Sequence, residues 1–317
     1  MFSWLVVLVL GGSAFAQESH LLVITGVGGD DEHSQSFHKW ATAMIDAAKK
    51  KDGLPDSNII YLSEKPELDP KLIQGKSTKE NVQKAFADLA AKARPSDTVL
   101  VVLIGHGSFD GRVAAFSMPG PDLTATDFAA LLGKLSTQRV AFVNTSSSSG
   151  AFLPTVAAPG RVVVTATKTG GERNETRFPE YFVEAFGDES ADRDRNGRVS
   201  VVEAFDYAKS KVVKAYEQEG HILTEHATLD EGGGPGLAAS LFLAAPQNAL
   251  KVDTSDPAMR ALVEERDKIE REIAALKLMK PSMDEAKYDA QMEKLLTELA
   301  LKTKAIRDRQ SKKEDDR

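Results

Sequence analysis

The sequence predicts an α/β fold with a mostly parallel central sheet, followed by a C-terminal helical hairpin. From His20 onward, short runs of β-branched and aliphatic residues alternate with amphipathic stretches, which is the rhythm of βα units around a parallel sheet. Several runs stop at a polar, glycine-containing turn, as central parallel strands do at their carboxyl ends. After about Lys251, glycine disappears and Glu, Lys, Leu, Ala and Arg dominate, which predicts helices.

The expected elements follow one another along the chain. The strands are Leu21–Thr25, Asn58–Leu62, Thr98–Ile104, Arg139–Asn144 and Arg161–Ala166. The helices are Ser36–Lys51, Thr78–Ala93, Thr126–Leu135 with Thr124 or Thr126 as its cap, Phe178–Phe186 and Val201–Glu217. The run Leu237–Ala244 fits either a last strand or a buried helix, because so short an apolar run does not distinguish them.

The N-terminus has the pattern of a secretory signal peptide. An apolar run, Leu5–Leu10, precedes Ala14-Phe15-Ala16, with small residues where a signal peptidase reads. We expect residues 1–16 to be removed and the mature chain to be secreted or periplasmic. The alternative is a membrane anchor, but the apolar stretch is shorter than the ~20 residues a spanning helix needs. We expect no membrane contact after cleavage.

Composition indicates which class of partner is unfavourable and what stabilises the fold. The net charge of -7 argues against a nucleic-acid partner, since binding phosphates needs a surplus of Lys and Arg on one face. The chain contains no cysteine. An exported chain of this kind must therefore draw its stability from its core rather than from disulfides.

Two polar turns follow neighbouring predicted strands. Gly105-His106-Gly107 ends the strand Thr98–Ile104, and Thr145–Gly150, with four consecutive serines, ends the strand Arg139–Asn144. The carboxyl ends of adjacent parallel strands meet at one edge of a sheet. We therefore expect the imidazole of His106 beside a serine hydroxyl.

This arrangement resembles the caspase-like (clan CD) peptidases, and within them the legumain-type family, in which one strand ends in Gly-His-Gly and the next in Cys-x-Ser-Gly. The resemblance covers about residues 20–245, with further support from Arg161–Thr167 and Thr224–Ala227. It implies a caspase-like three-layer sandwich over residues 17–250. It also implies that His106 is the general base, that the N–H of Gly107 is an oxyanion donor, and that Ser147 stands where the family has its cysteine.

The serine changes the chemistry that the resemblance implies. A thiol with a pKa of about 8.5 is partly ionised at neutral pH, whereas an alcohol needs a hydrogen-bonded base and a group that orients that base. Asp110, the nearest carboxylate in sequence, fits a turn residue better. The sequence favours a pseudopeptidase that binds a peptide or protein ligand in its cleft. The alternatives are an active endopeptidase using Ser147 and His106, and a calcium-stabilised structural protein.

The resemblance further implies that the loop Lys168–Thr176 lines a substrate pocket. Glu172, Arg173 and Glu175 are the candidates there for reading a charged peptide side chain. The alternative is a solvated loop of mixed charge. His33 is expected on the surface of a loop.

A separate segment, Asp192–Glu203, matches the EF-hand loop pattern, with glycine at its sixth position. Ser200 and Glu203 also form a capping-box pattern that starts a helix without metal. A single loop without a partner indicates a structural role for calcium. The expected oxygen ligands come from Asp192, Asp194, Asn196, the Arg198 carbonyl, Ser200 and bidentate Glu203.

Residues 251–310 are expected to form two antiparallel amphipathic helices around a break at Pro281. The alternative is a coiled-coil seam for self-association. Residues 311–317 are expected to be a disordered tail. The apolar positions are Leu262, Ile269, Ile273 and Leu276 before the proline, and Met292, Leu295, Leu299 and Ile306 after it.

Overall fold

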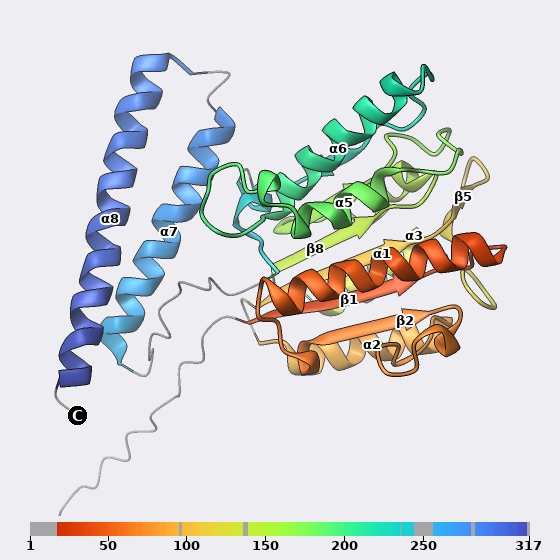
Figure 1. Ribbon diagram of the computed structural model, residues 1–317, viewed down its shortest axis with the longest axis horizontal. Coiled ribbons are helices and arrows are strands. Elements are labelled where there is room, and N and C mark those ends of the chain that lie inside the picture. Colours follow the sequence, from red (N-terminus) through yellow and green to blue (C-terminus); the bar gives the residue numbers. More distant parts are fainter. Residues whose placement is uncertain are drawn as a thin grey trace, which may run out of the picture.

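The computed structural model describes residues 18–94, 97–135, 139–234, 236–243, 256–279 and 283–315 (Figure 1). The expected signal peptide, residues 1–16, lies outside these ranges. Within them the chain forms an α/β three-layer sandwich with a helical hairpin beside it. The predicted fold class is therefore confirmed.

The central sheet has seven strands in the order β10-β9-β8-β4-β1-β2-β3. All neighbours are parallel except β10, which pairs antiparallel with β9 at one edge. The five predicted strands are all present, with ends that differ by no more than a few residues. The strands are β1 (Ser19–Thr25), β2 (Ile59–Ser63), β3 (Gly75–Lys76), β4 (Thr98–Ile104), β8 (Arg139–Asn144), β9 (Arg161–Thr165) and β10 (Thr228–Asp230).

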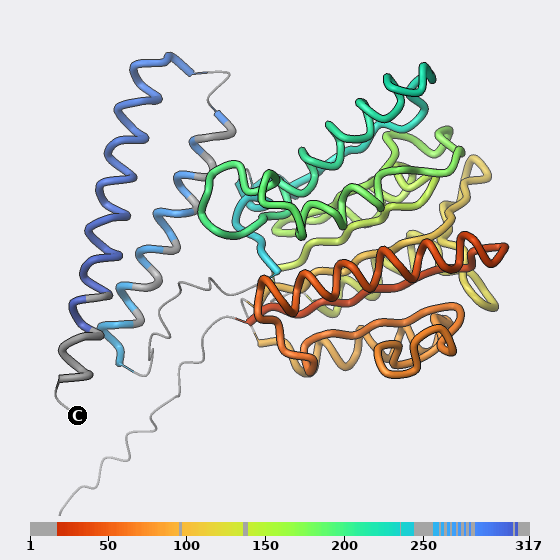
Figure 2. The backbone as a smooth tube through the Cα atoms, in the orientation of Figure 1, coloured from red at the N-terminus to blue at the C-terminus, as the bar shows by residue number. Residues whose placement is uncertain are grey.

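Helices cover both faces of this sheet. One layer contains α1 (Asp31–Lys50), α5 (Phe178–Gly187) and α6 (Val201–Gln218). The other contains α2 (Lys79–Lys92), α3 (Ala125–Leu132) and the short α4 (Leu153–Val156). The tube in Figure 2 shows α1 and α5 lying along the same face.

The two faces are built by alternation along each strand. Leu100, Val102 and Ile104 of β4 pack into the layer of α1 and α5. Val99, Val101 and Leu103 pack into the layer of α2 and α3. Successive strand side chains point to opposite faces, so a continuous apolar run is what a strand covered on both sides requires.

A side-chain cap explains why the first helix begins earlier than predicted. The prediction began the first helix at Ser36, but α1 begins at Asp31, because the Asp30 side chain caps it by accepting the N–H of His33 at 2.8 Å. Thr124, one of the two predicted caps, forms a capping box with Asp127 at the start of α3.

A small antiparallel sheet extends from the carboxyl end of β4. It consists of β5 (Gly107–Phe109), β6 (Ala114–Phe116) and β7 (Leu123–Thr124). These strands are too short to leave an alternating pattern in the sequence, and they were not predicted. Single 3-10 turns complete the elements: η1 (Asp56–Asn58), η2 (Pro66–Leu68), η3 (Gly133–Leu135), η4 (Ser149–Phe152), η5 (Glu189–Ala191) and η6 (Ala238–Ser240).

The run Leu237–Ala244 is neither of the two elements expected of it. Its described part contains η6 and a single β-bridge between Phe242 and Ser200. Leu241 and Leu243 are buried in the core, so the apolar character reflects burial of an irregular segment. Arg139 donates to the carbonyl of Ser240 at 2.7 Å, which satisfies a backbone group that no ladder reaches.

The predicted hairpin consists of α7 (Pro257–Met279) and α8 (Glu285–Asp315), which pack on each other (Figure 1). Ion pairs between Lys302 and Glu265 and between Arg309 and Asp256 fix the antiparallel pairing. Of the predicted apolar positions, four are buried: Ile269, Ile273, Leu276 and Ile306.

The prediction of a disordered tail over residues 311–317 was wrong for its described part, because α8 continues to Asp315. Its described part contains Lys312, Lys313 and Glu314, residue types with high intrinsic helix propensity. Across the described ranges, the helices are too short or too polar to cross a bilayer.

Candidate functional site

Three neighbouring strands deliver the candidate site to one edge of the sheet. β8, β4 and β1 lie side by side in parallel. Their carboxyl ends lead into the serine turn (Thr145–Gly150), the His106 turn (Gly105–Gly107) and a glycine turn before α1 (Gly26–Gly29), respectively. The N–H of Thr145 donates to the carbonyl of Leu103 at 3.0 Å, which extends the β4–β8 pairing into the turns. The expected juxtaposition of the His106 and Ser147 turns is therefore present.

Ser147 is bonded to the backbone of Gly107. Its hydroxyl donates to the Gly107 carbonyl at 3.0 Å and accepts the Gly107 N–H at 3.3 Å. The side chain is nearly buried, with 6% exposure. The N–H assigned to an oxyanion hole is thus directed at the serine hydroxyl itself.

His106 is held by a group that the sequence analysis did not identify. Its Nε2 lies 3.3 Å from the carbonyl oxygen of Gly28, in the turn after β1. A carbonyl only accepts, so Nε2 carries the proton in this contact. Within the described part of the chain, His106 and Ser147 make no hydrogen bond to each other. The orienting group is neutral, unlike the carboxylate of a serine-protease triad.

A second histidine lies against His106. His33, expected on a loop, occupies the first turn of α1, and its ring centroid is 5.3 Å from that of His106. Its Nδ1 is 2.7 Å from Asp30 and its Nε2 is 3.2 Å from Glu175. These carboxylates raise the pKa of His33, the hydrogen bond to Asp30 being the larger cause. An Asp-x-x-His pattern at a helix start is the signal that sequence reasoning missed.

The serine turn carries local strain and unpaired polar atoms. Ser148 has φ of 56°, a left-handed conformation that costs free energy in a residue other than glycine. Among the described residues, neither its buried Oγ nor the buried Nδ2 of Asn144 has a hydrogen-bond partner. Such groups in native proteins call for an explanation, of which a functional role is one.

The three predicted substrate-binding residues are not brought together. Glu172 accepts from Nδ1 and the backbone N–H of His226, each at 3.0 Å. Arg173 donates to the carbonyl of Phe109 in β5 at 3.2 Å. Glu175 faces His33, as described above. Their loop does border the serine turn, since the Ser148 N–H donates to the Glu172 carbonyl at 2.8 Å.

A pocket of about 550 Å³ is lined in part by Glu175, the carboxylate that contacts His33. Glu175 belongs to its lining, together with Trp40 of α1, Glu180 of α5 and Tyr216 of α6. A second pocket, of about 540 Å³, is more apolar and is bounded by α6 and β10. Neither of these two pockets includes His106 or Ser147 in its lining.

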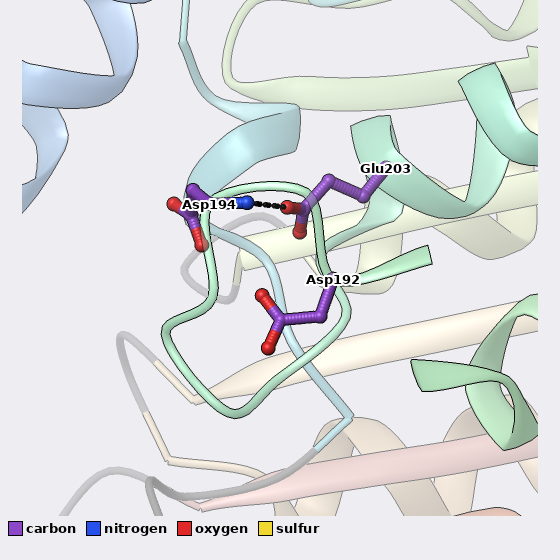
Figure 3. Close-up of side chains that lie close together, drawn as sticks. All are labelled: Asp192, Asp194 and Glu203. Atoms are coloured by element: carbon purple, nitrogen blue, oxygen red, sulfur yellow. Dashed lines mark hydrogen bonds between the residues drawn. The ribbon is translucent and has the colours of Figure 1, made fainter. Parts of the chain in front are cut away.

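The predicted calcium loop forms a compact turn in which three carboxylates converge (Figure 3). Oxygen atoms of Asp192, Asp194 and Glu203 lie within 4.8 Å of one another. Asp192 also accepts the backbone N–H groups of Asn196 and Gly197, at 3.0 and 2.8 Å. These contacts fold the loop around its first carboxylate.

The same loop contains the alternative, a metal-free capping box. Ser200 caps α6 by accepting the N–H of Glu203, and Glu203 accepts the Ser200 N–H at 2.9 Å. The other Glu203 oxygen accepts the N–H groups of Arg193 and Asp194. Carboxylate charge and spacing therefore fit calcium, while bidentate ligation by Glu203 competes with hydrogen bonds that it already makes.

Comparison with known proteins adds little to this geometry. No protein-family model matches the chain, and no curated protein matches it. Among solved structures, protein GSU0716 from Geobacter sulfurreducens is similar, with a TM-score of 0.45 and 13% sequence identity. The similarity covers 67% of this chain and 92% of that one. A functional assignment therefore has to come from the site itself.

Proposed function

We propose that this chain is an exported caspase-like domain of the legumain type that has lost peptidase activity and binds a peptide or protein ligand at its former cleft. The observation that carries the proposal is the state of Ser147, whose hydroxyl bonds the backbone of Gly107 at 3.0 and 3.3 Å rather than the imidazole of His106. An alcohol without a hydrogen-bonded base is a poor nucleophile at neutral pH.

The contacts of His106 support the same proposal. Its Nε2 proton is directed at the Gly28 carbonyl, a neutral group. In a serine peptidase the base is oriented by a carboxylate that also stabilises the imidazolium formed during attack. The carboxylates nearby, Asp30 and Glu175, bond His33 instead.

Strain and unpaired polar atoms at this edge of the sheet favour a binding role over catalysis. The strained Ser148 and the unpaired polar atoms of Asn144 and Ser148 are costly to maintain. A ligand that satisfies buried polar groups would offset this cost. The ends of neighbouring parallel strands are also where α/β proteins commonly bind ligands.

The nucleophilicity of Ser147 is tested with a fluorophosphonate reagent. We expect wild type and Ser147→Ala to show equal, background labelling. Because the chain has no cysteine, Ser147→Cys introduces a single thiol, and its alkylation by iodoacetamide reports whether a reagent reaches the cleft. Fluorophosphonate labelling of wild type that Ser147→Ala abolishes would favour the active-peptidase alternative.

A second proposal concerns calcium. The convergence of Asp192, Asp194 and Glu203 within 4.8 Å favours a structural calcium ion that stabilises the start of α6. These residues would hold the ion through carboxylate oxygens. We expect calcium to raise the Tm, with no effect of magnesium at the same concentration, because Mg²⁺ dehydrates reluctantly.

Self-association is a third proposal, and it concerns α8. Leu296 and Leu301 on this helix are 50% and 61% exposed. A second copy of the hairpin is the occupant we propose. Sedimentation of the full chain and of Leu301→Glu tests it, with a shift from dimer to monomer as the expected result.

A further inference from the structure

The pocket beside His33 combines aromatic walls with acidic side chains. Its volume is about 550 Å³, and its lining includes Trp40, Glu175, Arg177, Glu180 and Tyr216. Trp40 is half-buried, so part of its ring remains open to the pocket, whereas Tyr216 is 8% exposed. Aromatic rings and carboxylates around one cavity are the surroundings that stabilise an organic cation.

Two basic side chains that line the pocket, Arg177 and His221, both contact the carboxylate of Glu219. Both terminal nitrogens of Arg177 bond the carboxylate of Glu219 at 2.5 Å, and its guanidinium lies over the Tyr216 ring. Nδ1 of His221 lies 3.2 Å from the same carboxylate. Arg177 is therefore not available to bind an anionic ligand.

Glu180 differs from these groups. It is exposed on α5, and the described residues give it neither a hydrogen bond nor a salt bridge. Glu175, the other acid, shares its carboxylate with His33. The pocket thus presents one carboxylate that is unpaired among the described residues, beside the half-buried ring of Trp40, and a cation that enters would gain Coulombic and cation–π attraction together.

The pocket is joined to the His106 edge by side-chain contacts. Phe37 lies between them, with ring centroids 5.9 Å from Trp40 and 5.3 Å from His106. Glu175 provides a second connection, because it lines the pocket and also contacts His33. One buried ring, that of Phe37, therefore separates the pocket wall from the His106 ring.

We propose that this pocket binds the basic side chain, lysine or arginine, of a peptide ligand. This inference rests on the proposed function, since it names the ligand class of the same binding module. The pocket selects the positive charge through Glu180 and Glu175, and it covers the aliphatic stem with Trp40 and Tyr216.

Fluorescence offers a direct test, because the chain has two tryptophans, Trp4 and Trp40. In full-length Trp4→Phe, emission reports Trp40 alone. The probes are N-acetyl-arginine amide and N-acetyl-lysine amide, with N-acetyl-citrulline amide as the neutral match for arginine. We expect saturable changes with the two cations at millimolar concentrations, and at least about 3-fold weaker binding of the citrulline compound.

Variants assign the effect to the pocket. Glu180→Gln should weaken binding of the arginine probe by about 2- to 5-fold, the loss expected for one exposed ion pair. Glu217→Gln removes the same charge from an exposed position of α6 outside the pocket lining, and should change binding less than about 2-fold. Circular dichroism checks that each variant is folded.

The inference is overturned if the citrulline compound binds as well as the arginine compound, if Glu180→Gln and Glu217→Gln behave alike, or if no probe gives a saturable change. These results do not depend on catalysis. Ser147-dependent hydrolysis with intact probe binding would defeat the proposed loss of activity and leave the pocket assignment standing. If Trp40 emission does not respond to the probes while Ser147 shows no hydrolysis, the pocket assignment fails and the proposed loss of activity stands.

Discussion

Replacing Gly107 by alanine tests the close contact between the His106 turn and the serine turn. An ideal Cβ at this position would lie 2.4 Å from the Ser146 hydroxyl and 2.5 Å from the Ser147 carbonyl oxygen. The carbonyl belongs to the backbone, so it moves only if the serine turn moves. Gly107 also exchanges two hydrogen bonds with the Ser147 hydroxyl, at 3.0 and 3.3 Å.

The expected cost combines two effects. Overpacking of a tight contact costs about 1–3 kcal/mol. Loss or distortion of the two hydrogen bonds adds about 0.5–1.5 kcal/mol each. Because the turn relaxes in part, we expect Gly107→Ala to lower the free energy of unfolding by about 2–4 kcal/mol.

Gly133→Ala is the matched control. Gly133 ends α3 with φ of −62°, and a Cβ there would have no neighbour within 4 Å. Alanine should stabilise the protein by about 0.4–1 kcal/mol through the unfolded chain. Urea unfolding of both variants gives the comparison, with unchanged m-values required. A Gly107→Ala protein within about 0.5 kcal/mol of wild type would refute the packing of the two turns.

Three further predictions concern pH and the calcium loop. The Tyr207 hydroxyl lowers the pKa of Asp188 to about 2, so this contact stabilises the fold above about pH 4 and is lost as the pH falls through 2. Tyr207→Phe should lose less stability than wild type between pH 4 and 2. Free energies of unfolding from urea titrations that fall in parallel for the two proteins would contradict this. Burial raises the pKa of Asp52 to about 6. The folded protein is therefore destabilised by ionisation of this carboxyl as the pH rises from about 4 through 6. Asp52→Asn should match wild type at pH 4 and exceed it by about 1–2 kcal/mol at pH 8, a difference that equal stability at pH 8 would exclude. Ser200→Ala should cost about 0.5–2 kcal/mol even in EDTA because it removes the cap of α6, whereas Asp192→Asn should abolish any rise in Tm with calcium. If calcium still raises the Tm of Asp192→Asn, the ion does not bind at this loop.

The strands of the fold were predictable because their signal is local and strong. β4 and β8 agree with the predicted bounds, since each is an unbroken apolar run between polar turns. The short strands β5 and β10 were not, because three residues leave no period to detect. The Leu237–Ala244 run was misjudged because burial of irregular chain produces the same apolar composition as a strand.

The candidate site was predictable to the level of its turns. Strand order follows from parallel βα connections, so the proximity of His106 and Ser147 could be inferred. Individual hydrogen bonds could not, since they depend on side-chain rotamers and on backbone groups such as the Gly28 carbonyl. His33 and Glu175 are far apart in sequence and meet only in the fold.

Peptide hydrolysis tests the central claim most directly. Wild type and Ser147→Ala are incubated, with calcium present, with a diverse fluorogenic peptide library that includes lysine- and arginine-containing members. If the domain has lost its peptidase activity, the two proteins will be indistinguishable from each other and from buffer. Turnover by wild type that Ser147→Ala abolishes would contradict the account and establish a serine peptidase at this sheet edge.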